Sequence, residues 1–333
     1  MPDPVVTVAC WNYDRAAALL DGRVPVAGFR VAPVVLKSEQ LFPRAFARAE
    51  FDVSELSLSS YLLQLSRGES EYVAIPVFIS RAFRHGSVYI RTDRGIEVAR
   101  DLEGRAVGVP EYQMTLALWA RGILQDEYET DFRRIRWRTA GTNEPGRKER
   151  LPLRLPPEME VRPLPEGQTL NQRLLDGELD AIVSPTPPDC FVAGNPVVRR
   201  LFPDPGAEER AYFRRTGFFP IMHLIGIRRP LVEAFPELPA SLFRAFVAAK
   251  RVAVEEWDVV VRASANKTML PWVADAYAEA RGLMGENWWP YGVPANRAEL
   301  EAICRYSHEQ SLSDRLMEVH ELFAPGTEAL TDA

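Results

Sequence analysis

The chain has 333 residues, of which 47% are hydrophobic and 26% charged, and its formal net charge is −6. This length allows two domains or one large one, and the composition is that of a globular protein with enough apolar material for a core. The acidic balance argues against a nucleic-acid-binding protein, which usually carries a basic face. The one basic run, 133–138, alternates like a strand with a solvated charged face.

The N-terminus and the cysteines predict a cytoplasmic protein. Met1-Pro-Asp-Pro carries no basic region typical of a signal peptide, and no apolar run is long enough to span a membrane. Cys10, Cys190 and Cys304 are odd in number and far apart, so they form neither a disulfide framework nor a metal-binding spacing. We therefore expect reduced thiols and no association with membranes or nucleic acid.

The first hundred residues alternate between strands and helices. Apolar runs predict strands at 5–10, 28–36, 51–56, 72–78 and 86–91, and apolar residues at helical spacing predict intervening helices ending near 20, 49 and 65. This alternation is typical of an α/β protein with a mainly parallel sheet covered by helices.

The stretch 104–125 is the strongest local indication of a ligand site. A short apolar strand ends near Val109, and Pro110 fits the first turn of the apolar helix that follows. Ligands of open α/β sheets bind at the carboxyl ends of strands, where free helical N–H groups favour anions. We therefore expect Tyr112, Gln113 and Thr115 to bind substrate. The alternative is an ordinary strand-to-helix turn whose polar residues face solvent.

The rest of the chain predicts a second set of elements and a helical C-terminus. Strands are expected at 135–137, 180–184 and 216–228, an exposed loop at 143–157, and helices at 170–175, 208–215, 239–260, 272–283, 297–310 and 314–323. We predict two α/β lobes, the first formed by 1–100 and 222–333 and the second by 101–221, with crossovers near 95–105 and 218–226. The cleft between two such lobes is a preferred place for a ligand.

Two of the four histidines are candidates for proton transfer, because imidazole titrates near neutral pH. His308 and His320 lie in amphipathic helices and are interpreted as surface or packing residues. His85 and His223 lie beside strands of the predicted cleft, and we expect them to face each other there. Glu55 and Glu111 would orient or tune them. The alternatives are hydrogen-bonded core histidines, or a metal site formed by these four residues; we predict no metal.

Further polar residues are expected to bind an anionic substrate. Arginine matches a carboxylate bidentately, so Arg81 or Arg84 is predicted to bind one, the alternative being exposed salt bridges. Trp11 and Asn12 follow the first strand, and Ser184 ends the strand at 180–184. The chain contains no nucleophile elbow, phosphate-binding loop or dinucleotide fingerprint, and no organic cofactor is predicted.

Several motifs together resemble the 4,5-dihydroxyphthalate decarboxylase family. They are Phe83-Arg-His-Gly-Ser-Val-Tyr-Ile90, Gly108-Val-Pro-Glu-Tyr-Gln-Met-Thr115, Thr216-Gly-Phe-Phe-Pro-Ile-Met-His223, and Trp289-Pro-Tyr-Gly292 with Asn296-Arg297. The resemblance covers nearly the whole chain in the right order. It implies a two-lobed, type 2 periplasmic-binding-protein-like fold with an interlobe cleft and a helical C-terminal region, used by a cytoplasmic enzyme. Gly86 and the loop at 141–157 depart from the family pattern.

The resemblance implies conversion of 4,5-dihydroxyphthalate to 3,4-dihydroxybenzoate and carbon dioxide. That chemistry needs a base at the phenol, an acid over the ring carbon that loses carbon dioxide, and cations for the carboxylates; His, Glu and Arg supply these functions. The partner is thus a small aromatic carboxylate, and a homo-oligomer is left open. Two alternatives remain: a solute-binding module that only captures an aromatic carboxylate, and another aromatic-acid enzyme on the same fold.

Overall fold

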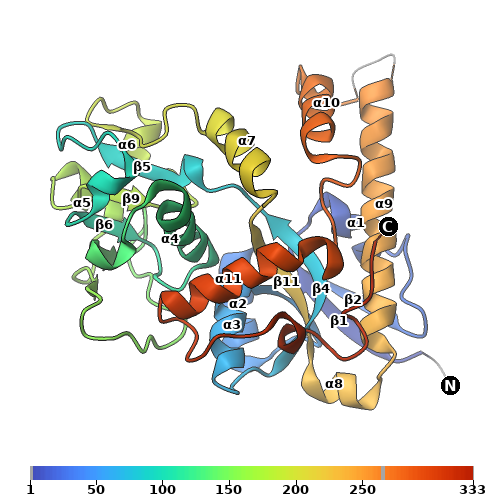
Figure 1. Cartoon of the computed structure of the whole chain (residues 1–333). Helices are drawn as coiled ribbons and strands as arrows, with labels where there is room; N and C mark the ends of the chain where they lie inside the picture. The colour runs from blue at the N-terminus through green and yellow to red at the C-terminus, as the bar shows by residue number, and fades with distance from the viewer. Residues whose placement is uncertain (1–2, 264–266, 333) are drawn as a thin grey trace.

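Two β-sheets, one in each lobe, organise the computed structural model, which describes residues 3–263 and 267–332 (Figure 1). The first sheet has the order β2-β1-β3-β11-β4. Its strands are β1 (Val5–Cys10), β2 (Arg30–Val35), β3 (Val53–Ser57), β4 (Tyr72–Arg81) and β11 (Ile221–Arg228). β1 pairs in parallel with β2 and β3, whereas β11 lies antiparallel between β3 and β4, so the sheet is mixed.

The second sheet has the order β10-β5-β9-β6-β7-β8. Its strands are β5 (Val88–Arg91), β6 (Ala106–Val109), β7 (Arg136–Thr139), β8 (Val161–Pro163), β9 (Ala181–Val183) and β10 (Val198–Arg200). β6 is parallel to β7 and β9, and β5 is antiparallel to β9 and β10. In β7 the indole of Trp137 is buried and Arg136 is exposed, as expected for a strand with one solvated charged face.

The chain passes between the sheets twice, and the first passage lies earlier than predicted. β5 pairs with β9 through Val88 and Val183, so the chain leaves the first sheet between Arg81 and Val88 and not at 95–105. The apolar patterns of β4 and β5 are alike and carry no information about which sheet each strand joins. The return lies between α7 (Pro205–Thr216) and β11, which joins the first sheet as expected.

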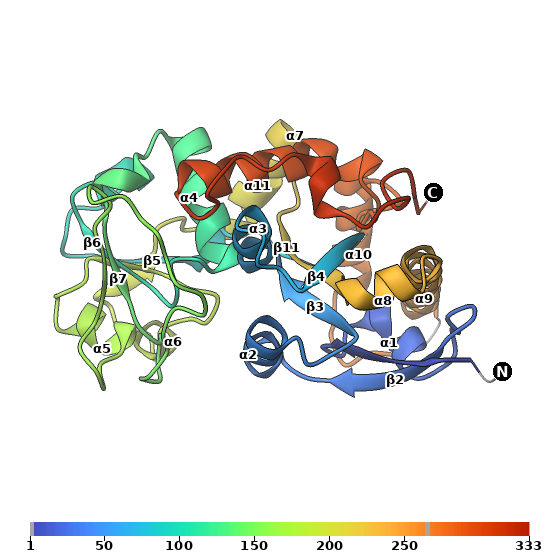
Figure 2. The same ribbon diagram turned by 90° about the horizontal axis from the view of Figure 1, so that it is seen from below.

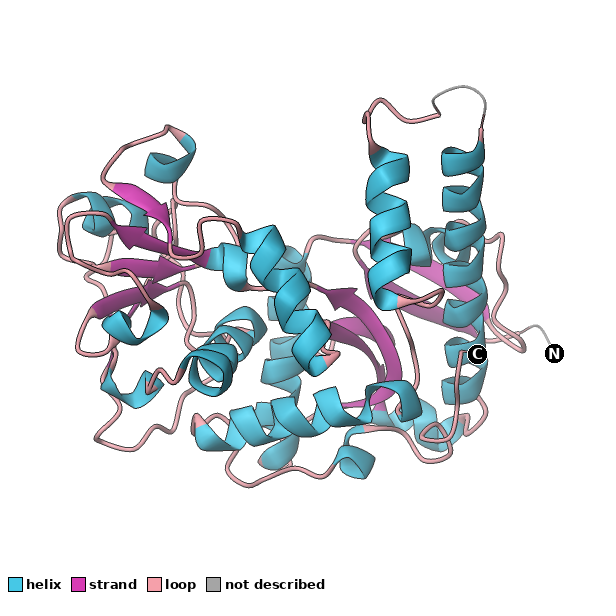
Figure 3. Ribbon diagram, turned by 45° about the horizontal axis from the view of Figure 1, so that its top comes forward, coloured by secondary structure: helices cyan, strands magenta, loops and turns pink. Residues whose placement is uncertain are grey.

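Helices cover both sheets (Figure 3), and they make up most of the described chain after β11. They are α1 (Asp14–Leu20), α2 (Ser38–Arg48), α3 (Leu58–Ser66), α4 (Thr115–Tyr128), α5 (Leu170–Leu175), α6 (Asp189–Val192), α8 (Arg229–Ala234), α9 (Leu238–Arg262), α10 (Val273–Met284) and α11 (Arg297–Glu309). The predicted helix at 314–323 is wrong except for one 3-10 turn, Val319–Leu322. No helix in the described ranges has the length and apolarity needed to cross a bilayer.

Helix α11 ties the two lobes together, running across both of them (Figure 2). Tyr306 of α11 packs over Gly122 of α4, where a Cβ atom would lie 2.4 Å from the tyrosine ring. The Tyr306 hydroxyl donates to Asp126 at 2.6 Å, which also pairs with Arg305. Glycine in this buried helix therefore permits the close approach that fixes α4, and hence its N-terminus, against the first lobe.

Candidate active site

A cavity between the lobes gathers most of the polar side chains that point to chemistry. It measures about 120 Å³, less than three other cavities formed by the described residues, and its polar lining is what distinguishes it. Residues of both lobes and of the first interlobe connection line it: Ser38, Glu39, Phe42, Ser57, Arg84, Met114, Thr115, Leu116, Arg147, Arg150, Pro185, Met222 and His223.

Three helices begin at this cavity. Ser38 and Glu39 open α2, Ser57 precedes α3, and Thr115 opens α4. None of the three N-cap residues makes a side-chain capping bond. In α3 the Ser59 N–H donates to Thr115 Oγ1 at 3.1 Å, whereas the first N–H groups of α2 and α4 have no acceptor among the described residues. The arrangement follows from the parallel strands β2, β3 and β6, whose carboxyl ends all lead to the cleft. Three positive dipole ends favour an anion there.

His223 is the imidazole that lines the cavity, and it is held by a buried carboxylate. Its Nδ1 lies 2.6 Å from Glu55 Oε1, and its ring meets Phe42 edge-on at 4.9 Å. β11 and β3 are adjacent antiparallel strands, which brings these two residues together across the ladder. With Nδ1 bonded to Glu55, Nε2 is the ring nitrogen left for a substrate proton.

The remaining contacts of Glu55 keep its carboxylate ionised. The Tyr13 hydroxyl donates to Oε1 at 2.6 Å and the Trp11 N–H to Oε2 at 3.0 Å. Burial acts to raise the pKa of Glu55, but the hydrogen bonds from His223, Tyr13 and Trp11 and the charge of His223 outweigh it, so the pKa lies below its ordinary value. An ionised Glu55 stabilises a positively charged His223 and fixes the direction of its ring.

Arginines supply positive charge on the other walls. Glu111 Oε1 accepts from Arg147 at 2.8 Å and from Arg150 at 3.2 Å, and Arg150 also donates to the Ser60 hydroxyl at 3.1 Å. Glu111 is buried behind the two guanidinium groups and does not line the cavity. It therefore serves to position the arginines, which together retain a net positive charge.

Arg84 is a third cation, on the connection between β4 and β5. Its Nε lies 3.1 Å from Met222 Sδ, and within the described ranges its guanidinium has no carboxylate within 4.0 Å. Burial lowers the pKa of Arg84 to about 10, against a smaller opposing effect of Glu209, so it is still charged at neutral pH. A half-buried cation without an ion-pair partner is a strong candidate for binding an anionic ligand.

Comparison with known proteins gives the family. The chain is 41% identical over 322 residues to a 4,5-dihydroxyphthalate decarboxylase of Comamonas testosteroni, with 97% of each chain covered. It is 42% identical over 213 residues to a protein of the same name from Pseudomonas putida, covering 64% of this chain and 83% of the relative. The chain belongs to the 4,5-dihydroxyphthalate decarboxylase family. No family model matches it.

The fold is that of the periplasmic binding proteins, as predicted. The aliphatic sulphonate binding protein SsuA from Escherichia coli superposes with a TM-score of 0.55 at 13% identity, over 96% of this chain and 97% of SsuA. At this identity the likeness concerns the fold alone. Both predictions, the two-lobed α/β fold and the membership of the family, are thus confirmed.

His85 is not placed where the sequence predicted. Its ring is buried among Tyr128, Phe202 and Tyr212, with centroids 5.2 to 6.0 Å away, and neither ring nitrogen has a partner among the described residues. It does not line the cavity that holds His223, so the prediction that the two histidines face each other is wrong. Arg84 and His85 are neighbours in sequence, and only Arg84 reaches the cavity.

Replacing His85 by phenylalanine should make the fold less sensitive to acid. Burial lowers the pKa of His85 from 6.5 to about 4. Between these values the unfolded chain binds a proton that the folded chain does not, so the free energy of unfolding falls by about 1 kcal/mol per pH unit as the pH drops. Urea unfolding of both proteins at pH 7 and pH 5 measures this. Equal losses of stability in the two proteins would contradict it.

Arg81 is also outside the cavity. Its guanidinium is buried against Glu299 at 3.1 Å, the carbonyls of Phe219 and Pro290, and the side chain of Asn296. Burial raises the pKa of Glu299 to about 7 despite the nearby Arg81. The structure therefore does not place Arg81 at the substrate site as predicted: both of its Nη atoms already donate to protein acceptors, and it does not line the cavity.

The other predicted binding residues support the cavity or lie apart from it. Thr115 lines it, and its Oγ1 bonds the Ser57 hydroxyl at 2.9 Å, joining the two lobes. Gln113 is buried and donates to the Leu151 carbonyl at 2.8 Å, and Tyr112 packs under Arg121. Ser184 bonds Thr142 and the Thr186 carbonyl, and Trp11 and Asn12 are exposed. The cavity lining does not include Trp11, Asn12, Tyr112, Gln113 or Ser184.

The loop at 143–157 is where sequence reasoning missed functional residues. It was expected to be exposed, but Arg147 and Arg150 line the cavity and Leu151, Leu153 and Leu155 pack against the core. Glu149 accepts the backbone N–H groups of Tyr112 and Gln113 at 2.5 and 3.3 Å. The leucines at every second position, 151, 153 and 155, were the available signal that this charged loop lies against the protein.

Proposed function

We propose that the chain catalyses the non-oxidative decarboxylation of 4,5-dihydroxyphthalate to 3,4-dihydroxybenzoate and carbon dioxide. The observation that carries this is a His223–Glu55 pair at a cavity whose other charged groups are mainly arginines. Such a cavity suits an aromatic dianion that must exchange a proton. Membership of the 4,5-dihydroxyphthalate decarboxylase family supports the same substrate.

The two carboxylates of the substrate bind the cations and the helix N-termini. Arg84 lies on the connection between the lobes, and the Arg147–Arg150 pair projects from the second lobe, so an anion can be held at two separated points. The first N–H groups of α4 add donors between them. Bidentate guanidinium contacts fix the plane of each carboxylate, and with it the plane of the ring.

His223 and Glu39 carry out the proton transfers. They are the imidazole and the carboxylate that line the cavity. Glu39 accepts the proton of the hydroxyl para to the departing carboxylate, and His223 donates a proton to the ring carbon that bears it. The hydroxyl oxygen forms a C=O bond to the ring, and the ring electron pair that this displaces forms the new C–H bond at the carbon that bears the carboxylate. The C–C bond then breaks, and its electrons restore the aromatic ring as carbon dioxide leaves.

Glu55 contributes by stabilising the imidazolium. Its buried carboxylate pairs with the charged form of His223 before the proton is given up. The electrons released by the C–C bond return to the ring, so this chemistry needs no organic cofactor as electron sink. Protonation of the ring carbon gives a non-aromatic dienone intermediate. The arginines hold the carboxylates of this intermediate until carbon dioxide leaves.

The direct test is incubation of the purified protein with 4,5-dihydroxyphthalate. Ultraviolet absorbance follows the aromatic ring, and trapped carbon dioxide is measured in parallel. We expect one carbon dioxide and one 3,4-dihydroxybenzoate for each substrate consumed, and no turnover above background with the His223→Gln variant. Saturable binding of the substrate without carbon dioxide release would make the chain a binding protein and contradict the proposal.

Arg84→Met should weaken substrate binding without unfolding the protein. A hydrogen bond to a charged group contributes about 1.5–3 kcal/mol, which corresponds to a rise in KM of about tenfold to a hundredfold. The lost cation has no ion-pair partner among the described residues, so no buried carboxylate is stranded. Steady-state kinetics and a melting curve measure the two effects. Arg100→Met, an exposed change far from the cavity, is the control, and an unchanged KM for Arg84→Met would remove Arg84 from the site.

A further inference from the structure

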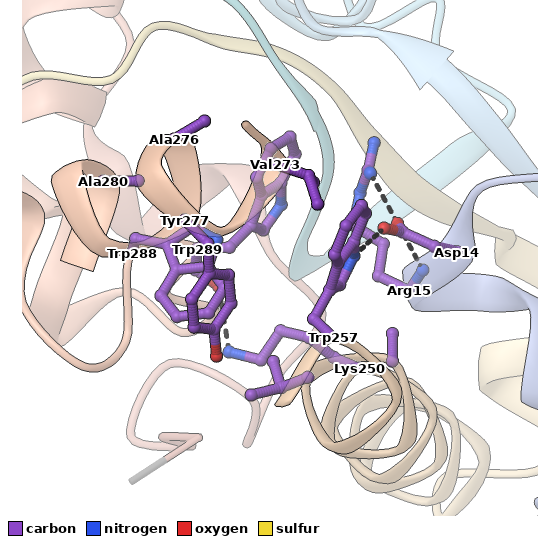
Figure 4. Close-up of a pocket in the computed structure, with 12 residues that line it drawn as sticks. Asp14, Arg15, Lys250, Trp257, Val273, Ala276, Tyr277, Ala280, Trp288 and Trp289 are labelled. Atoms are coloured by element: carbon purple, nitrogen blue, oxygen red, sulfur yellow. Dashed lines mark hydrogen bonds and ion pairs between the residues drawn. The ribbon is translucent and has the colours of Figure 1, made fainter. Parts of the chain in front are cut away.

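A second cavity lies outside the interlobe site and shares no lining residue with it. It measures about 310 Å³, is partly open to solvent, and is bordered by α1, α9, α10 and the segment at 288–289 (Figure 4). Its lining is Asp14, Arg15, Lys250, Ala253, Val254, Trp257, Val273, Ala276, Tyr277, Ala280, Trp288 and Trp289. We call it the aromatic cavity.

The shape of the aromatic cavity suits a flat ring. Trp257 stands on one side, and Tyr277, Trp288 and Trp289 on the other (Figure 4). Tyr277 and Trp288 are packed edge to face at 5.2 Å, and small side chains on α9 and α10 leave the space between. A volume near 300 Å³ is at the lower end of the range for small-molecule sites.

The charges around the aromatic cavity are already paired. Asp14 bonds Arg15 at 3.1 Å and the Trp257 indole N–H at 3.1 Å. Lys250 pairs with Asp332 and also donates to the Trp289 carbonyl at 2.9 Å. A charged ligand would have to compete with these contacts, so the lining selects an uncharged aromatic molecule, in contrast to the dianion proposed for the interlobe cavity.

The wall of the aromatic cavity is linked to the His223–Glu55 pair. The Arg15 guanidinium lies between the ring of Trp289 at 4.0 Å and the ring of Tyr13 at 4.3 Å. The Tyr13 hydroxyl donates to Glu55 Oε1, the same oxygen that contacts His223. A ligand that displaces Trp289 or Arg15 therefore changes the support of Tyr13, and with it the hydrogen bonds that orient His223.

We propose that the aromatic cavity binds an uncharged aromatic molecule and that its occupancy changes turnover through Arg15 and Tyr13. The effect on turnover rests on the decarboxylase activity proposed above, whereas the binding does not. Exposed apolar residues beside the cavity, Leu270 and Trp272, give a second copy of the chain as the competing occupant. A slot lined by rings on two sides favours the small molecule over a protein surface.

The test uses 2-naphthol as the probe, with binding measured by calorimetry and turnover by carbon dioxide release. Ala280→Trp fills the aromatic cavity, and Ala278→Trp makes the same change on α10 at an exposed position that does not line it. We expect wild type and Ala278→Trp to bind one 2-naphthol and to change kcat at least threefold on saturation. Ala280→Trp should bind at least tenfold more weakly, with melting temperatures confirming that both variants fold.

Two further variants separate binding of the probe from its effect on turnover. His223→Gln should still bind 2-naphthol, because the two cavities are distinct. Tyr13→Phe, which removes the hydroxyl bonded to Glu55, should bind the probe but lose the response of kcat. Absence of saturable binding, equal binding by Ala280→Trp, or binding with unchanged kcat in wild type would overturn the proposal. A change of sedimentation mass in Ala280→Trp, with unchanged probe affinity, would overturn it in favour of a second copy. Absence of any decarboxylation would instead defeat the proposed function.

Discussion

His223→Gln is expected to lower kcat by about a hundredfold to ten-thousandfold, the usual range for losing a general acid or base. The imidazole is the proton donor placed at the cavity, and its Nδ1 bond to Glu55 leaves Nε2 for the substrate. Glutamine keeps a polar side chain near Glu55 but cannot carry a transferable proton. Steady-state kinetics with 4,5-dihydroxyphthalate measure kcat, and the melting temperature shows whether the variant is folded.

His85→Gln is the matched control for this change. The His85 ring packs among aromatic side chains away from the cavity, so kcat should stay within about threefold of wild type. If the His85 variant loses activity as severely as the His223 variant while remaining folded, the division of roles drawn from the structure is wrong. A normal kcat in His223→Gln would equally contradict it.

Arg81→Met is expected to reduce the free energy of unfolding by about 3–5 kcal/mol, the cost of breaking a buried ion pair on one side. The substitution strands Glu299 and Asn296 without the guanidinium that satisfies them. The Phe219 and Pro290 carbonyls lose their donor as well. Chemical denaturation of the purified variant measures the loss, and kinetics at low temperature measure activity for each folded molecule.

The double variant Arg81→Met with Glu299→Leu tests the physical reason. Removing both charges leaves no uncompensated ion, so the double variant should be more stable than Arg81→Met alone. For the folded molecules of the double variant, we expect a KM near that of wild type. If Arg81→Met has unaltered stability and a raised KM, Arg81 binds substrate and this interpretation of the structure is wrong.

Much of the fold could be predicted from the order of apolar runs. The two sets of strands, the return of β11 and the helical C-terminus follow from patterning and from the family motifs. The sheet joined by β5 could not be predicted, because a short apolar strand satisfies its hydrogen bonds equally well in either lobe. The segment at 314–323 has an apolar pattern but forms only one 3-10 turn. Most of its apolar side chains are buried, in part by packing against α11, and this burial does not require a regular helix.

The candidate site was predicted in part. His223 and Glu55 occupy neighbouring strands, and Thr115 opens a helix, so strand order places them at one cleft. Arg81, Arg84 and His85 lie within five residues, and no periodic pattern in this connection indicates which side chain reaches the cleft. Arg147 and Arg150 come from a loop whose alternating leucines indicate packing against the protein, but this alternation does not specify that the two arginines reach the cleft.

Decarboxylation in deuterium oxide shows whether this protein protonates the ring carbon that loses carbon dioxide. Nuclear magnetic resonance of the 3,4-dihydroxybenzoate formed from 4,5-dihydroxyphthalate would locate the new hydrogen. We expect one deuterium at the vacated ring carbon for each carbon dioxide released, and neither product with His223→Gln. Substrate that is bound and recovered unchanged, or product formed at the wild-type rate by His223→Gln, would contradict it.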